Sequence, residues 1–153
     1  MTVQAPVQAP VQVPLSDDEL LARFEAATLT PDVFDHREHV RLAWLHVTRM
    51  PLLEAIRIQC AGLQRLTAAL GVPKKFHATI TVAWVLLVHD RVAAGAGASW
   101  PAFREANPDL LERGAAVLGR HYSAATLGSN EARGAFVPPD LDVTSMSRSG
   151  PMV

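Results

Sequence analysis

The sequence predicts an all-α fold, a compact single-domain bundle of about five to six helices with flexible termini. Apolar residues recur at helical spacing through most of residues 16–142. Helix start and stop signals interrupt that pattern at short intervals. No alternation of apolar and polar residues is long enough to indicate a strand, because the β-branched run at 80–88 lies inside a longer helical pattern.

The first three predicted helices are defined by their boundary residues. Ser16 and Glu19 match a capping box, which starts a helix that extends to about residue 27. Asp35 is the expected N-cap of a second helix, which ends near residue 50 because Pro51 follows. A third helix is expected over 52–70, where apolar residues keep helical spacing, and Gly71 is its stop signal.

The later helices are shorter, apart from the fourth. The fourth is predicted over 75–94, before a Gly-Ala-Gly sequence at 95–97. Ser99 is the expected cap of a short fifth helix. Asn107 is the expected N-cap of a sixth, with proline at its first position, which extends to residue 122. Ser129 is the expected cap of a last short turn over 130–135.

Length, composition and charge describe an ordinary globular chain. With 153 residues, of which 49% are hydrophobic and 19% charged, a single domain with one core is expected. The net charge of −1 comes from interspersed charges, so nucleic-acid binding has no support. The longest apolar run is far shorter than the ~20 residues that span a bilayer, and the N-terminus lacks the features of a signal peptide. A cytoplasmic location is therefore expected, and the single cysteine, Cys60, is consistent with it.

The chain divides into three predicted segments. Residues 1–14 repeat a Val-Gln-Ala-Pro unit, in which a proline at every fourth position prevents a helix and favours an extended conformation. We therefore expect a disordered arm over 1–15, a helical domain over 16–142 and a flexible tail over 143–153.

Two histidines open the second predicted helix. His36 and His39 are three residues apart, so their side chains lie one turn apart on the same helix face. His46 falls on that side two turns further along, within an arc of roughly 100°. Histidines on an otherwise apolar stripe indicate either a metal site or a buried polar network.

A third histidine, His77, stands at the start of the fourth predicted helix. The positive end of the helix dipole disfavours its protonated form, and a neutral imidazole is the form that binds a metal. If successive helices are antiparallel, the second and fourth run parallel and begin at the same end of the bundle. His36, His39 and His77 would then form a three-histidine site with an open fourth position, which is typical of catalytic metal sites. Histidine ligands suit zinc, iron or copper, so the metal stays open among these three.

Each of these residues also has a structural explanation. A lone histidine on an apolar face is often a hydrogen-bonded core residue, and this alternative carries most weight for His46. His89 is expected at a solvated edge of the fourth helix, and His121 near a helix C-terminus, where it complements the dipole. Asp35 is assigned to capping rather than to metal ligation.

Several further residues are assigned to the site. Catalytic roles are assigned to His39, Arg41 and Tyr122, with Arg41 binding an anionic substrate group and the C-terminal segment around Tyr122 folding over the site. The predicted substrate pocket is lined by Trp44, Thr81 and Trp84. For Arg41 the alternative is a solvated side chain, and for the two tryptophans it is a place in the core.

The sequence also excludes several known mechanisms. It lacks a Ser-His-Asp order, a glycine-rich phosphate loop and an HExxH motif. Two motifs do resemble those of a group of small, largely uncharacterised bacterial all-α proteins: FxHxxHVRLAW at 34–44 and KFHATIT at 75–81. A Tyr-Ser pair at 122–123 and the segment 136–141 add to the resemblance, which covers most of residues 16–142.

The resemblance implies that His36, His39 and His77 act together, and it implies no particular reaction. In that group the second motif commonly reads Lys-Tyr-His-Glu-Thr, whereas this chain has Phe76 and Ala78 at the tyrosine and glutamate positions. If that glutamate is a ligand or a general base, this chain has lost it.

The leading hypothesis is a small metal-dependent enzyme of specialised metabolism, which uses a three-histidine site to activate water, dioxygen or a small-molecule substrate. One alternative is a metal-free biosynthetic enzyme in which histidine acts as general acid or base. Another is a non-catalytic ligand-binding or accessory protein that reaches its partner with the N-terminal arm. The expected partner is a small molecule, with no nucleic acid and no membrane, and a homodimer is left open.

Overall fold

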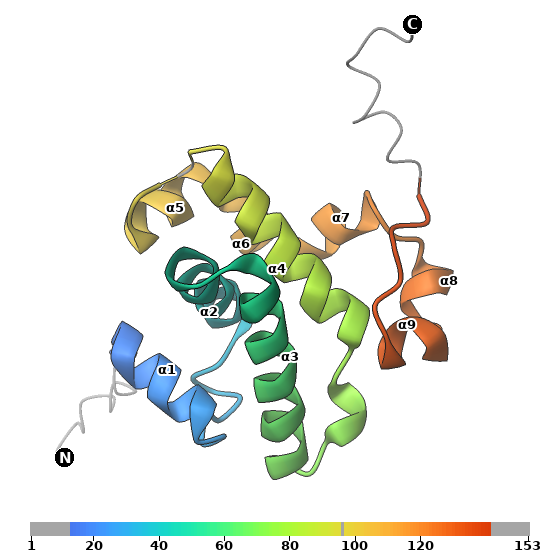
Figure 1. Ribbon diagram of the computed structural model, residues 1–153, viewed down its shortest axis with the longest axis horizontal. Coiled ribbons are helices and arrows are strands. Elements are labelled where there is room, and N and C mark those ends of the chain that lie inside the picture. The colour runs from blue at the N-terminus through green and yellow to red at the C-terminus, as the bar shows by residue number, and fades with distance from the viewer. Residues whose placement is uncertain (1–12, 96, 142–153) are drawn as a thin grey trace, which may run out of the picture.

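The computed structural model describes residues 13–95 and 97–141, and all regular secondary structure in these ranges is helical (Figure 1). The all-α prediction is therefore confirmed. Residues 1–12 of the predicted arm and all of the predicted tail lie outside the described ranges.

Three long helices form the centre of the molecule, and short helices surround them. The long helices are α2 (His36–Arg49), α3 (Leu52–Ala69) and α4 (Ala78–Ala93), and α4 packs against both of the others. The helix α1 (Asp17–Glu25) packs against α2 and α3. A 3₁₀ turn, η1 (Pro73–Lys75), leads from α3 to α4. The remaining helices are α5 (Trp100–Ala106), α6 (Pro108–Glu112), α7 (Gly114–Gly119), α8 (Ala124–Leu127) and α9 (Asn130–Gly134).

The boundaries of the first three helices agree with the sequence signals. The Ser16 hydroxyl accepts a hydrogen bond from the Glu19 amide at 3.2 Å, and the Asp35 carboxylate accepts one from the Glu38 amide at 3.0 Å. Gly71, with φ of 74°, follows α3 in the left-handed region, which glycine adopts without strain. These caps confirm that short-range signals are enough to start and stop the helices here.

Three boundaries differ from the prediction. The fourth helix begins at Ala78 rather than at about residue 75, because a separate 3₁₀ turn ends at Lys75 and His77 is the N-cap. The helix expected over 108–122 is broken at Arg113 into α6 and α7, and Tyr122 lies beyond its end. The break brings Gly114 so close to His36 and Trp84 that a Cβ atom there would lie 2.8 Å from the histidine ring and 2.9 Å from the indole. Asn107 does not cap α6 with its side chain, because that side chain donates to the Phe103 carbonyl and accepts from Arg91.

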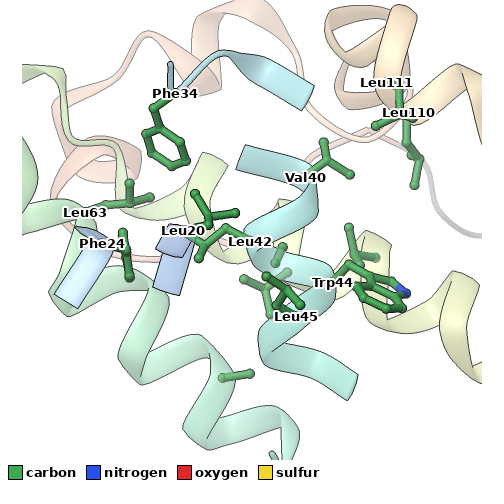
Figure 2. Close-up of a cluster of buried hydrophobic side chains, with 14 of the residues drawn as sticks. Leu20, Phe24, Phe34, Val40, Leu42, Trp44, Leu45, Leu63, Leu110 and Leu111 are labelled. Atoms are coloured by element: carbon green, nitrogen blue, oxygen red, sulfur yellow. The ribbon is translucent and has the colours of Figure 1, made fainter. Parts of the chain in front are cut away.

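The main hydrophobic core lies between α1, α2 and α3, and it continues along α2 to α4 and α6. Figure 2 shows Leu20 and Phe24 of α1 beside Leu42 and Leu45 of α2. A smaller cluster joins Ala83 of α4 to Leu118 and Tyr122 near the C-terminal helices. Among the described residues, no helix has both the length and the apolar character needed to cross a membrane.

Candidate functional site

A cavity of about 390 Å³ opens where α2 and α4 begin, against the middle of α3. This volume is within the range of small-molecule sites. Its lining contains all three histidines of the predicted site, together with Thr81 and Trp84. The remaining lining residues are Phe34, Asp35, Gln59, Leu63, Thr67, Lys75, Phe76 and Ile80. The structure therefore brings the beginnings of α2 and α4 to one cavity, as the sequence predicts.

His36 is fixed at the first residue of α2. Its Nε2 lies 2.8 Å from the Leu110 carbonyl oxygen, so this nitrogen carries the proton and donates it. Its ring meets Trp84 edge-on, with ring centroids 5.0 Å apart. Because Gly114 packs closely behind both rings, α7 holds this corner of the cavity in place.

His39 is the least constrained of the three in its polar contacts. Its ring stacks on Phe34 with centroids 3.9 Å apart and an interplanar angle of 17°. Burial lowers the pKa of His39 to about 4, since it removes water from the charged form; nearby His36 lowers it further, and Asp35 opposes the shift. No hydrogen bond joins this imidazole to any described residue. His39 thus presents a neutral ring with unpaired nitrogen atoms to the cavity.

His77 has neither ring nitrogen free. It is the N-cap of α4, where its Nδ1 accepts a hydrogen bond from the Ile80 amide at 3.1 Å. Its Nε2 donates to the Leu127 carbonyl at 2.7 Å. This donor and acceptor pattern is one neutral imidazole tautomer with both positions used. The ring therefore anchors α8 to the start of α4.

The three histidines line one cavity, but their hydrogen bonds differ in how far they leave nitrogen atoms open to a metal. Among the described residues, no group of three or more His, Cys, Asp or Glu side chains is placed to hold a metal ion. A metal ligand needs a free lone pair, and both nitrogens of His77 are bound by the backbone, so His77 could ligate a metal only after giving up one of these bonds.

The threonines of the KFHATIT motif also have structural partners. The Thr79 hydroxyl, completely buried, donates to the Ala135 carbonyl at 3.0 Å and accepts from the Val137 amide at 3.0 Å. The Thr81 hydroxyl donates to the His77 carbonyl at 2.8 Å. Thr79 therefore holds the segment that follows α9 against α4, whereas Thr81 remains within its own helix.

Tyr122 and the C-terminal segment fold against α4 away from the histidine cavity. The Tyr122 hydroxyl donates to the Val137 carbonyl at 2.7 Å, and burial and the charge of Asp140 raise the pKa of this phenol. The residue lines a different, mainly apolar cavity of about 180 Å³. In Figure 1, α8 and α9 lie beside the beginning of α4. The segment around Tyr122 thus buttresses the helix that carries His77, and it does not line the predicted site.

Two other assigned residues lie away from the cavity. Arg41 is buried, and its guanidinium donates to the Leu15 carbonyl and to the carboxylates of Asp17 and Glu38 at distances of 2.7–3.0 Å. It joins the beginning of α1 to α2. Trp44 belongs to the main core, with its ring centroid 6.0 Å from that of Trp100. Trp44 therefore has the place in the core that was the alternative to a pocket role. Arg41 is neither a cavity residue nor solvated, because it is buried and paired with two carboxylates.

The sequence interpretation missed Gln59 as a lining residue. Gln59 is 3% exposed on α3, and its Oε1 accepts a hydrogen bond from Nδ1 of the buried His46 at 2.5 Å. The signal was present, because position 59 lies three residues after Ile56 and four before Leu63 on the apolar face. A glutamine on that face needs a polar partner.

Searches of the chain against protein-family models, curated proteins and solved structures found no match. The resemblance to small bacterial all-α proteins stays a prediction. The chemistry of the cavity is therefore interpreted from its own geometry.

Proposed function

We propose that the cavity between α2, α3 and α4 binds a small organic molecule, and that His39 is its general acid–base group in a reaction that needs no metal. The main support for this proposal is the neutral His39 ring, which lines the cavity and has no hydrogen-bonding partner among the described residues. A neutral imidazole both accepts and donates, and a lowered pKa makes its protonated form release the proton readily. Stacking on Phe34 holds the ring in one orientation.

The walls of the cavity support this proposal. Phe34, Leu63 and Trp84 supply apolar surface, and a few hydrogen-bonding side chains lie between them. This combination is typical of sites in which apolar contacts provide affinity and a few polar groups orient the ligand. His77 has both ring nitrogens bound by backbone and His36 has one, so His39 is the histidine of the cavity with neither nitrogen engaged.

The test is an NMR titration of the ¹⁵N-labelled full chain with small uncharged aromatic fragments, acetophenone first. We expect shifts at the Trp84 indole N–H and at the amides of Gln59 and His77. We expect His39→Leu to bind acetophenone about five-fold more weakly, which corresponds to one lost hydrogen bond. His89→Leu is the matched control, since His89 is half-buried beside Asp90 on a distant turn of α4. Fragments that leave all cavity resonances unchanged would overturn the proposal.

The metal-dependent enzyme is the alternative proposal for the same residues. It requires His77 to release the Leu127 carbonyl or the Ile80 amide before a nitrogen is free to bind a metal. Elemental analysis after expression in medium supplemented with zinc, iron and copper separates the two proposals. Near-stoichiometric metal that His39→Ala loses would support the alternative. Fragment binding that persists in a strong chelator would support the metal-free site.

A further inference from the structure

Gln59 places a buried polar group in the wall of the cavity. It comes from the middle of α3, where the neighbouring residues on its face are apolar. The side chain is 97% buried and still lines the cavity. Its carboxamide therefore borders the space that a ligand would fill.

His46 fixes the orientation of this carboxamide. Because Nδ1–H of His46 donates to Oε1 of Gln59, the oxygen is turned away from the cavity and the NH₂ group is turned toward it. That NH₂ group has no hydrogen-bond partner among the described residues. In the described part of the chain, the buried side-chain atoms that lack a partner are Arg41 Nε and Trp44 Nε1, so this NH₂ group keeps contact with the solvent of the cavity. A ligand that places an acceptor there exchanges a bond to water for a bond inside a largely apolar site.

Resting on the proposed function, we infer that Gln59 donates a hydrogen bond to an uncharged carbonyl oxygen of the bound molecule, and that His46 is the positioning residue for this contact. The substrate class is an apolar, preferably aromatic, molecule that carries a ketone, amide or ester carbonyl. The NH₂ group selects for the carbonyl oxygen, and Phe34, Leu63 and Trp84 pack against the apolar skeleton.

The charges around the cavity favour an uncharged acceptor over a carboxylate. Among the described residues, Lys75 is the one lysine or arginine in the lining of the cavity, and it is exposed at the end of η1. A carboxylate next to Gln59 would be buried without a cation, and this costs much more than burial of a neutral carbonyl. Asp35 also lines the cavity and would repel an anion.

The experiment compares two probes that differ by one group, acetophenone and α-methylstyrene, with benzoate as the charged probe. The readout is the side-chain NH₂ signal of Gln59 in the ¹⁵N-labelled full chain, identified by its disappearance in Gln59→Met. Acetophenone is expected to shift this signal and to bind about five-fold more tightly than α-methylstyrene. Benzoate is expected to bind more weakly than acetophenone.

Variants test the donor and its positioning separately. Gln59→Glu keeps the shape of the side chain and the oxygen that accepts from His46, but it removes the NH₂ donor. Gln59→Met removes both the NH₂ donor and the accepting oxygen, and it introduces no charge. Each is expected to abolish the five-fold preference for acetophenone, whereas Gln64→Glu, an exposed position on α3, keeps it. His46→Leu is expected to lose the preference while its affinity for α-methylstyrene is unchanged.

The outcomes separate this inference from the proposed function. If both probes bind equally and the Gln59 signal does not move, the small-molecule site stands and the role of Gln59 is overturned. If benzoate binds most tightly, or if Gln59→Glu keeps the preference, the inference is likewise overturned. If no probe shifts any cavity resonance, the proposed function fails and the inference fails with it.

Discussion

The α4 wall of the cavity and the wall made by α2 and α3 contain the same kinds of polar residue but use them differently. At the α4 wall, both ring nitrogens of His77 are bound by backbone, one by the Leu127 carbonyl and one by the Ile80 amide. Thr79, on α4 but outside the lining of the cavity, binds the backbone of the C-terminal segment. On the other wall, His39 has no partner among the described residues, and Gln59 has one only for its oxygen.

The difference shows how two histidines near one cavity come to have different roles. A ring whose nitrogens are both bound by backbone stabilises the fold, and it has no lone pair or proton left for a substrate. A ring with unpaired nitrogens in a cavity has both a lone pair and a proton that a substrate can use. Mutations on the α4 wall should therefore reduce stability, whereas mutations at His39 and Gln59 should change ligand binding.

The largest expected effect on stability is that of Thr79→Val. The change leaves the Ala135 carbonyl and the Val137 amide without their hydroxyl partner beside a completely buried position. We expect the free energy of unfolding to fall by about 3 kcal/mol, measured by urea denaturation. Thr48→Val is the control, since its hydroxyl bonds only carbonyls of its own helix and is expected to change stability by less than about 0.5 kcal/mol. Equal losses in the two variants would contradict the assignment of Thr79 as a clamp.

The next effect is the pH dependence that His39 gives to stability. Its pKa is about 4 in the folded chain and 6.5 in the unfolded chain, so the unfolded state binds more protons between these values. Stability is then lost as the pH falls from 6.5 toward 4, and it is unaffected by this residue above that window. After discounting for partial exposure, the loss is about 2 kcal/mol.

His39→Phe isolates this contribution, because phenylalanine keeps a ring against Phe34 and does not titrate. Urea denaturation at pH 6.5 and at pH 4.5 should give a smaller difference in the variant than in the natural chain. A residual difference is expected from His46, whose pKa burial also lowers. The same pH dependence in both proteins would show that His39 is not held neutral.

The smallest expected effect separates the two hydrogen bonds of His77. Asparagine is a good N-cap, so His77→Asn keeps a bond to the Ile80 amide and loses only the contact with Leu127. His77→Ala loses both, and it should be less stable than His77→Asn by about 1 kcal/mol in thermal or urea unfolding. Two variants of equal stability would mean that the cap contributes nothing.

Short-range signals in the chain predict most of the helix boundaries and the end of the bundle where the histidines meet. Ser16 and Asp35 bond to amides three residues away, and Gly71 adopts a left-handed conformation at the end of its own helix. These effects are local, so the sequence pattern is enough to predict them. The three-residue spacing of His36 and His39 likewise placed them on one face, and the alternating direction of successive helices brought His77 to the same end.

Contacts between distant segments set which polar atoms keep no hydrogen-bond partner. His77 is bound by a carbonyl fifty residues away, His46 by a side chain on the next helix, and Arg41 by α1 and the segment before it. The break at Arg113 likewise goes with a contact between distant segments, the close approach of Gly114 to His36 and Trp84. Hydrogen bonds and packing between distant segments depend on how the helices meet, and local patterns do not contain that information.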